Sequence, residues 1–201
     1  MNLLRLFTLT CITGLTFAAP TKTNVVFILI DDFGYECVTA NGGESYRTPV
    51  MDKLAATGVR LEQAHAQPLC TPTRVALMTG QFPARWSVHQ HFASPEKNRK
   101  MRQVDWLDPA APTLARLLKE AGYRTAHFGK WHLNGHKGPG VPIFADDPYA
   151  PSRFGFDEWV SVSNFYDVDP LMSRAGKFEQ MKGDSSEVAV AEAVSFLVHI
   201  K

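Results

Sequence analysis

The chain has 201 residues and carries 21 lysine and arginine residues against 20 aspartate and glutamate residues. This balance excludes a nucleic-acid binder that relies on bulk positive charge. Because 45% of the residues are hydrophobic and 11% are aromatic, an acidic disordered chain is excluded as well. Three cysteines are too few for a disulfide-built scaffold, and the length indicates one domain or part of a larger one.

The N-terminal segment has the three-part pattern of a secretory signal peptide. Arg5 is its only charge, residues 6–17 form a mostly apolar run, and small residues follow from Ala18. We therefore expect a signal peptide over residues 1–18 and a mature chain over residues 19–201 that is secreted or periplasmic. The apolar run is shorter than the about 20 residues that span a bilayer, so no transmembrane segment is expected after cleavage. A membrane anchor or a core helix is the alternative interpretation.

Cleavage would leave Cys37 and Cys70 as the two cysteines of the mature chain. A secreted location permits one disulfide between them. The residues alone leave this pairing open.

Strand patterns and helix patterns alternate along the rest of the chain. Residues 24–30, NVVFILI, are a β-branched apolar run typical of a strand buried on both faces. A helix is predicted next, which opens at Thr48 and Pro49 and stops at Gly58, followed by a short strand over 59–66 and a helix over 72–78 that ends near Gly80. After these come an amphipathic helix over 112–121 closed by Gly122, a strand over 123–128 and a loop over 134–151. The last predicted element is an amphipathic helix over 185–200, with a buried stripe of Val188, Ala191, Val194, Phe196 and Leu197. This order predicts an α/β fold with a mostly parallel sheet flanked by helices.

The first cluster that could carry chemistry is Asp31 and Asp32, at the end of the apolar run. Ligands of open α/β sheets gather at the carboxyl ends of strands. Two adjacent carboxylates repel each other unless a positive charge compensates, and oxygen ligands favour calcium or magnesium over zinc. A solvated turn in which one aspartate caps a helix is the plainer interpretation of the pair alone.

The second cluster is Cys70-Thr71-Pro72-Thr73-Arg74. Pro72 fits the first turn of a helix and Thr71 fits its N-cap, which places Cys70 just before a helix N-terminus. Unpaired N–H groups and the helix dipole favour an anion there, and Arg74 adds positive potential. The position suits an activated nucleophile, while a structural or disulfide-bonded cysteine is the alternative.

The third cluster is Lys130 and His132, which follow the strand predicted over 123–128. In extended geometry, residues two apart point the same way, so these two side chains are expected to share a face. A lysine supplies fixed charge toward an oxyanion, and a histidine can exchange a proton near neutral pH. Each residue taken singly is more often an ordinary surface residue.

Taken together and in order, these clusters resemble the N-terminal part of the sulfatase family, within the alkaline-phosphatase-like superfamily. The resemblance covers nearly the whole mature chain. It rests on NVVFILIDDFGY at 24–35, TPVMDKLAATGVRLEQAHAQPLCTPTRVALMTGQFPAR at 48–85, PTLARLLKEAGYRTAHFGKWHL at 112–133 and RFGFDEW at 153–159. Thr73 stands where many members have serine.

The resemblance implies a sulfuric ester hydrolase that works through formylglycine, an aldehyde made by oxidation of Cys70 with a formylglycine-generating maturation enzyme. One hydroxyl of the hydrated aldehyde attacks the sulfur and the alcohol leaves. The other hydroxyl then loses its proton, sulfate departs, and the aldehyde returns. Covalent catalysis of this kind needs no water to attack the sulfated intermediate.

The resemblance also assigns roles residue by residue. Asp31, Asp32 and the modified residue 70 bind a divalent cation, usually calcium, with magnesium as the other candidate. Arg74, Lys130 and His132 surround the sulfate or the diol. The substrate class is a sulfated small molecule or carbohydrate, and nucleic acid is not among the expected partners. The resemblance argues against a disulfide at position 70 and suits a buried structural thiol at Cys37.

Sulfatases are usually more than twice this long, and further metal and sulfate ligands lie downstream of the matched segments. We therefore expect a truncated or fragmentary sulfatase domain whose site is incomplete by itself. Three alternatives stay open: a phosphonate or phosphodiester hydrolase of the same superfamily, a degenerate non-catalytic sulfatase-like fragment, and a generic α/β binding module.

Overall fold

The computed structural model describes residues 22–137, 141–164 and 166–200. The chain divides into two units, Met1–Asp31 and Asp32–Lys201. The predicted signal peptide, residues 1–18, lies outside the described residues. Among the helices of the described residues, none combines the length and the apolar character needed to cross a membrane.

The second unit holds all the regular elements of the described chain. Its helices are α1 (Pro49–Thr57), α2 (Cys70–Thr79), α3 (Pro95–Lys100), α4 (Leu114–Glu120) and α5 (Ser185–His199). Its strands are β1 (Ala126–Lys130), β2 (Glu158–Val162), β3 (Leu171–Arg174) and β4 (Lys177–Gln180). Short 3₁₀ turns occur at η1 (Tyr35–Cys37), η2 (Thr39–Asn41), η3 (Pro83–Trp86) and η4 (Pro151–Phe154).

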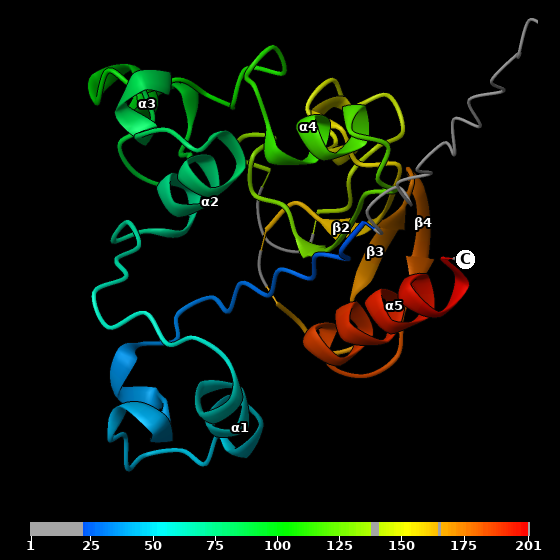
Figure 1. Ribbon diagram of the computed structural model, residues 1–201. Coiled ribbons are helices and arrows are strands. Elements are labelled where there is room, and N and C mark those ends of the chain that lie inside the picture. The colour runs from blue at the N-terminus through cyan, green and yellow to red at the C-terminus, as the bar shows by residue number, and fades with distance from the viewer. Residues whose placement is uncertain (1–21, 138–140, 165, 201) are drawn as a thin grey trace, which may run out of the picture. The chain divides into compact units, whose positions relative to one another are not determined.

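The four strands form one sheet in the order β1-β2-β3-β4 (Figure 1). β1 and β2 are parallel, with Ala126 opposite Glu158 and Lys130 opposite Val162. β2 and β3 are antiparallel, as are β3 and β4. The α/β class is thus confirmed, and the sheet of the described residues is mixed, because a β-hairpin extends the parallel pair.

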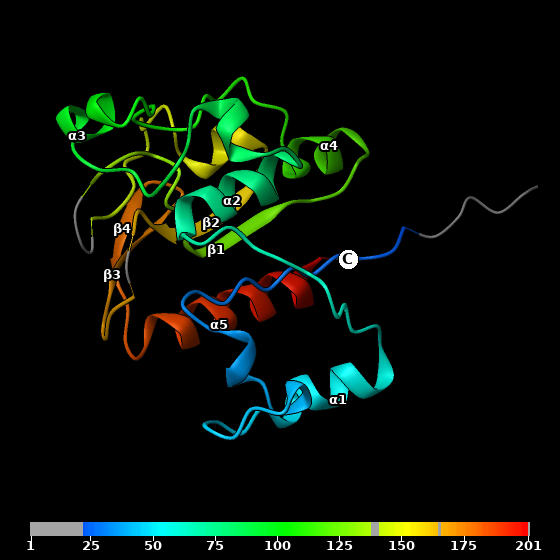
Figure 2. The same cartoon turned by 90° about the vertical axis from the view of Figure 1, so that its left-hand side faces the viewer.

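Two hydrophobic clusters lie on opposite faces of this sheet. The alternation of side chains along a strand sends Trp159 to one cluster and the neighbouring Val160 to the other. The larger cluster contains Val75 of α2 together with Trp131, and the smaller one includes Val188 of α5. Figure 2 shows α2 and α4 on one side of β1 and β2, and α5 on the other.

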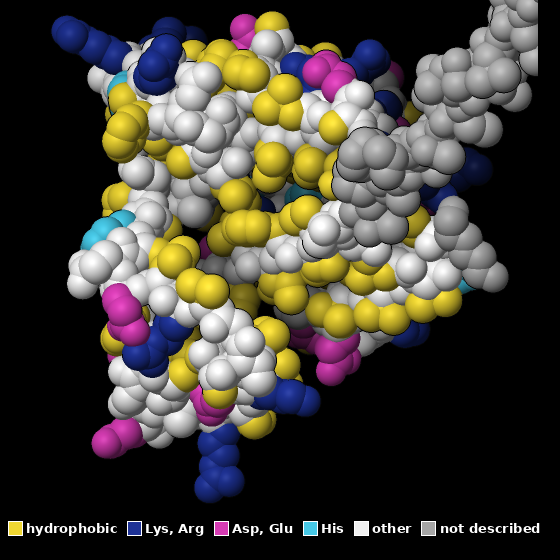
Figure 3. Space-filling model, viewed as in Figure 1, with side chains coloured by type: hydrophobic (Ala, Val, Ile, Leu, Met, Phe, Trp, Pro, Cys, Tyr) yellow, Lys and Arg dark blue, Asp and Glu magenta, His cyan; other side chains and the backbone are white. Residues whose placement is uncertain are grey.

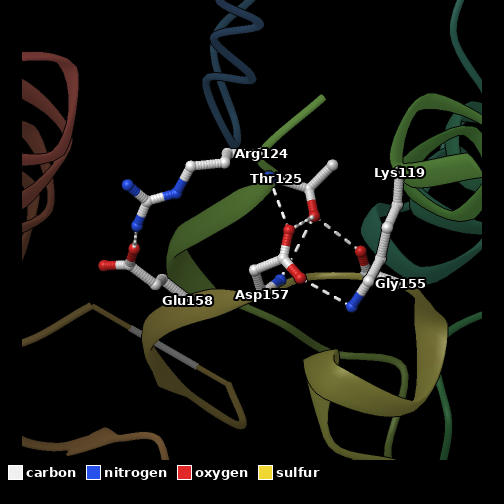
Figure 4. Close-up of polar contacts among 6 residues, drawn as sticks. All are labelled: Lys119, Arg124, Thr125, Gly155, Asp157 and Glu158. Atoms are coloured by element: carbon white, nitrogen blue, oxygen red, sulfur yellow. Dashed lines mark hydrogen bonds and ion pairs between the residues drawn. The ribbon is translucent and has the colours of Figure 1, made fainter. Parts of the chain in front are cut away.

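Polar contacts join β1 and β2 where the two strands begin (Figure 4). The Thr125 amide donates to Asp157 Oδ2 at 3.0 Å, and the Thr125 hydroxyl donates to the Gly155 carbonyl at 2.6 Å. Lys119, in α4, lies 2.6 Å from Asp157 Oδ1. Burial raises the pKa of Asp157, but the bonds from Lys119 and Thr125 outweigh burial and hold that pKa below its usual value. These contacts align the strands at the end opposite to Lys130.

Several helix ends lie at the residues that the sequence marks. α1 starts at Pro49 and stops at Gly58, and α2 stops at Gly80, whose φ of 65° is left-handed. α5 begins after Asp184, whose side chain accepts a hydrogen bond from the Ser186 amide at 2.7 Å. These helix predictions are confirmed.

The strand predicted over residues 123–128 begins three residues later than expected. The end of α4 explains the shift. The Gly122 amide donates to the Lys119 carbonyl at 2.8 Å, and the Tyr123 amide donates to the Leu118 carbonyl at 3.0 Å. Both are bonds of a helix-terminating Schellman motif, so Tyr123 still belongs to the helix end.

Two predicted strands, residues 24–30 and 59–66, are wrong for the described structure. Neither segment has regular structure, and Ile28 and Val59 are 75% and 88% exposed. A strand exists only through hydrogen bonds to a neighbouring strand, and the described structure gives these segments no ladder. An apolar, β-branched composition therefore does not suffice to make them strands.

The buried stripe predicted for α5 is wrong in part. Val188 and Phe196 do face the sheet, where the Phe196 ring lies 5.9 Å from the Phe128 ring. Val194 and Leu197 are exposed instead, as is Ala191. Figure 3 shows hydrophobic side chains along α5 at the surface. Apolar residues occur around most of this helix, so periodicity could not select the face that packs.

Candidate functional site

Cys70 is the first residue of α2. The helix begins two residues earlier than predicted, with Leu69 as the N-cap, and Thr71 lies inside the first turn rather than at the cap. No side chain caps this terminus, and Pro72 has no amide hydrogen to satisfy. The amides of the first turn have no partner within the helix, and together with the helix dipole they favour negative charge beside Cys70.

The Cys70 thiol is free and only partly buried. The disulfide between Cys37 and Cys70 is therefore absent from the structure. Cys37 is also partly exposed, and its Sγ lies 3.7 Å from Glu36 Oε1. The expectation of a buried structural thiol at Cys37 is wrong, because the short η1 turn that carries it has no buried residue.

Arg74 ties α2 to the end of β1. Its side chain is 7% exposed, and Nη1 donates to the Lys130 carbonyl oxygen at 2.6 Å. Residues four apart lie on the same face of a helix, so Arg74 and Cys70 share the face of α2 that meets β1. The second and third clusters predicted from the sequence are therefore brought together by this contact.

His132 meets the same helix terminus through Thr71. The Thr71 hydroxyl lies 3.4 Å from His132 Nδ1, and both residues are buried. The His132 amide donates to the Ser163 carbonyl at 2.7 Å. The φ of His132 is 56°, so extended geometry ends before this residue. The prediction that Lys130 and His132 share a face by strand alternation therefore does not hold, although both belong to one cluster.

Trp131 anchors the segment between these two residues. It is 1% exposed, its indole N–H donates to the Tyr149 carbonyl at 2.8 Å, and its ring makes an edge contact with Phe154 at 5.2 Å between centroids. Lys130 is only partly buried, and its Nζ lies 5.8 Å from the centre of the Tyr166 ring. The buried Trp131 therefore fixes the backbone between its two sequence neighbours, the cation Lys130 and the buried His132.

Asp31 and Asp32 stand at the boundary of the two units. Asp32 has a left-handed φ of 52°, which aspartate tolerates better than most residues. Carboxylate oxygens suit a hard cation, but a calcium ion takes six to eight oxygen ligands. Among the described residues, no group of three or more histidine, cysteine, aspartate and glutamate side chains could hold a metal ion. The two carboxylates fit the chemistry of the implied cation, and the described residues do not supply a full ligand set.

A buried polar cluster under the His132 loop was missed by the sequence reasoning. Asn134 is 1% exposed, and its Nδ2 donates to Asp147 Oδ2 and to Ser163 Oγ, each at 3.0 Å. Ser163 is also the residue whose carbonyl accepts the His132 amide. These residues come from three separate segments, so no local pattern in the sequence could have revealed the cluster.

His127 is a second residue that the sequence reasoning missed. Its Nδ1 lies 2.7 Å from Ser161 Oγ, and its ring makes an edge contact with Trp131 at 5.0 Å. Burial, with a smaller contribution from the Arg74 charge, lowers the pKa of His127 to about 3. The imidazole is therefore neutral at physiological pH and adds no charge beside Arg74.

These groups are the candidate site for an anion, next to a potential nucleophile at Cys70. Positive potential comes from three groups: the side chain of Arg74, the side chain of Lys130 and the amides at the start of α2. Cys70 is the first residue of the same helix, and His132 lies next to Thr71 in its first turn. Such an arrangement can bind a tetrahedral oxyanion and stabilise charge that develops on it.

Comparison with known proteins identifies the family of the chain. The model of the Sulfatase family matches residues 23–201. Steryl-sulfatase of Mus musculus is 38% identical over 162 residues, which cover 76% of this chain and 24% of that protein. Arylsulfatase G of Canis lupus familiaris is 37% identical over 148 residues, which cover 73% of this chain and 24% of that protein.

Solved structures share the fold. A protein in complex with its substrate D-glucosamine-2-N,6-O-disulfate superposes with a TM-score of 0.65 at 27% identity, over 85% of this chain and 30% of that chain. The yidJ protein of Bacteroides fragilis superposes with a TM-score of 0.71 at 26% identity, over 91% of this chain and 42% of that chain. The chain spans about a quarter of the length of the curated relatives. On the match of the family model over residues 23–201, the chain belongs to the sulfatase family.

Proposed function

We propose that the whole protein hydrolyses sulfate monoesters, with residue 70 as the nucleophile after a formylglycine-generating enzyme and an external oxidant convert Cys70 to formylglycine. The observation that carries the proposal is the contact of Arg74 with the Lys130 carbonyl. This contact joins the head of α2, where Cys70 lies, to the end of β1. It brings Arg74 and the nucleophile position to the end of the strand that carries Lys130.

The side chains of this chain have distinct tasks in the proposal. When present, hydrated formylglycine supplies two hydroxyls on one carbon, one to attack sulfur and one to expel sulfate. Arg74 and Lys130 hold the sulfate oxygens and offset their charge, with the N–H groups of the first turn of α2. His132 gives or takes a proton at the oxygen of the departing group. Burial of Trp131 fixes the backbone that presents both Lys130 and His132.

Asp31 and Asp32 are the residues that would hold a divalent cation, together with the oxidised side chain at position 70. Calcium is the proposed ion, and magnesium is the other ion with the same preference for oxygen. Bound there, the cation would add positive charge next to the sulfate. Ligands beyond these three positions are required, because a complete set is absent from the described residues.

The proposed substrates are sulfated carbohydrates or small sulfate esters. A solved structural relative binds a disulfated glucosamine as its substrate, and another relative is an N-acetylgalactosamine-6-sulfatase. We also propose secretion or periplasmic export through a signal peptide over residues 1–18. The N-terminal sequence of the purified mature protein tests this, and a retained Met1 would count against it.

Paired assays of the whole protein on an aryl sulfate and an aryl phosphodiester test the reaction. The proposal predicts turnover of the sulfate, loss of that activity in Cys70→Ala, and retention in the matched control Cys37→Ala. Turnover of the diester alone would identify a phosphonate or phosphodiester hydrolase. Turnover of neither compound, with residue 70 converted, would identify a non-catalytic relative.

A further inference from the structure

A cluster of exposed cations lies on and just after α3, away from the groups used above. Lys97, Arg99, Lys100 and Arg102 fall within six residues, and all four are exposed. Only Lys100 has an ion pair there among the described residues, with Glu96 at 2.8 Å. We call residues 97–102 the basic turn. Figure 3 shows the dark blue side chains over the position of α3 in Figure 1.

The basic turn is built on a buried amide. Asn98 is fully buried, and its Oδ1 accepts from the Ala93 amide at 3.0 Å and from Gln103 Nε2 at 3.1 Å. Its Nδ2 donates to the Ala93 carbonyl at 2.9 Å and to Asp105 Oδ1 at 2.6 Å. With all its hydrogen-bonding groups engaged, Asn98 fixes the backbone from which the cations project.

Gln103 closes the same frame from the other side. Its Oε1 accepts from the amides of His89 and Gln90, at 2.9 and 2.8 Å. Arg102, between this glutamine and α3, has a left-handed φ of 53°, a conformation that strains a non-glycine residue. The cations therefore stand on a rigid support, so ordering them on binding costs less than it would on a flexible loop.

Cations at the end of a helix are often explained by the helix dipole, but that explanation is insufficient here. α3 has six residues, and the effect of the dipole falls off within the last turn of a helix. Arg102 lies beyond the helix. The whole chain has a formal net charge of +1, so this positive charge is a local concentration and not part of a basic surface.

The basic turn is connected to the candidate active site by a short segment. The Leu107 amide donates to the Leu133 carbonyl at 3.2 Å, and Leu133 follows His132 directly. Leu107 is five positions after Arg102, so their Cα atoms lie at most about 18 Å apart. A polymer held at the basic turn could therefore extend to the site at Cys70.

We propose that the basic turn is a binding surface for the chain of a sulfated polysaccharide, separate from the site at Cys70. The choice of partner rests on the proposed function. Sulfate esters keep their negative charge at all physiological pH values, and guanidinium groups bind their oxygens in pairs. The surface would hold the polymer while one of its sulfate esters reaches the catalytic site.

Binding of fluorescent dextran sulfate to the full chain tests this surface, with unsulfated dextran as the neutral probe. The test variant is Lys97→Gln/Arg99→Gln/Arg102→Gln. The matched control Arg47→Gln/Lys53→Gln/Lys177→Gln likewise removes three exposed basic residues, elsewhere on the chain. We expect the test variant to bind dextran sulfate about tenfold or more weakly at low salt, with the slope of log K against log salt reduced by about two to three. The control should change affinity by less than about threefold.

Equal losses in the two variants would overturn the proposal, because binding would then follow net charge alone. Equal affinity for a single-stranded oligonucleotide of matched charge would also overturn it, since the surface would then accept any polyanion. Circular dichroism melting checks that both variants fold. Hydrolysis of a small aryl sulfate by the whole protein should be unchanged in the test variant. Failure of that assay in the wild type refutes the proposed function and leaves the binding result standing.

Discussion

Replacing Asn134 with alanine tests how the buried polar cluster supports the His132 loop. The substitution removes two hydrogen bonds of 3.0 Å, one to the Asp147 carboxylate and one to the Ser163 hydroxyl. A bond to a charged group contributes about 1.5–3 kcal/mol and a neutral one about 0.5–1.5 kcal/mol. Both acceptors would stay buried after losing this donor. The expected loss in the free energy of unfolding is therefore about 2–4 kcal/mol.

Thermal unfolding followed by circular dichroism measures this loss. For a chain of about this length, each kcal/mol lowers Tm by roughly 2–4 °C, so Asn134→Ala should lower it by about 5–15 °C. Asn41→Ala is the matched control, because Asn41 is less buried and makes one bond, to the Tyr35 carbonyl at 3.2 Å. It should cost less than about 1 kcal/mol.

The same variant should loosen the backbone at His132. The His132 amide donates to the carbonyl of Ser163, a residue that Asn134 holds through its hydroxyl. Hydrogen exchange of the His132 amide should therefore become faster in Asn134→Ala than in the control. A loss of stability below about 0.5 kcal/mol, or unchanged exchange at His132, would refute the reasoning that the cluster supports this loop.

Three further predictions follow from the same region. The pKa of His127 is about 6.5 in the unfolded chain and about 3 in the folded one, so its contribution of roughly 5 kcal/mol is complete above pH 6.5 and is lost as the pH falls toward 3. The wild type should lose more stability than His127→Gln between pH 6.5 and about 4, and parallel pH curves would contradict this. Thr71→Val removes the hydroxyl beside His132 Nδ1 and should cost about 1 kcal/mol while shifting the His132 ring signals in NMR spectra; unshifted signals would disprove the contact. Trp131→Phe removes the bond to the Tyr149 carbonyl and should cost about 1–3 kcal/mol in urea unfolding, whereas an unchanged midpoint would show that the indole anchors nothing.

Helix ends that are set by a single residue can be predicted from the sequence. Gly58 and Gly80 end their helices as expected, since a glycine stops a helix through its own backbone freedom. The apolar run at 24–30 shows the opposite case. Its structure depends on a neighbouring strand, and composition cannot supply one.

The sequence predicts which residues belong to the candidate site, but it does not predict how they are arranged. Cys70, Arg74, Lys130 and His132 were recognised from their order along the chain and from the family resemblance. The contact that joins them, between Arg74 and the Lys130 carbonyl, links residues 56 apart and involves a main-chain atom that every residue possesses. Neither this contact nor the left-handed backbone of His132 has a signature in the sequence.

Mass spectrometry of the peptide that contains residue 70, from protein expressed with a formylglycine-generating enzyme, tests the central claim most directly. The peptide with Cys37 serves as the internal control, because its thiol lacks the helix terminus and the neighbouring Arg74. We predict that residue 70 has lost two hydrogens and exchanged its sulfur for oxygen, while Cys37 stays intact. An unmodified cysteine at position 70 under these conditions would contradict the assignment of Cys70 as the precursor of the nucleophile.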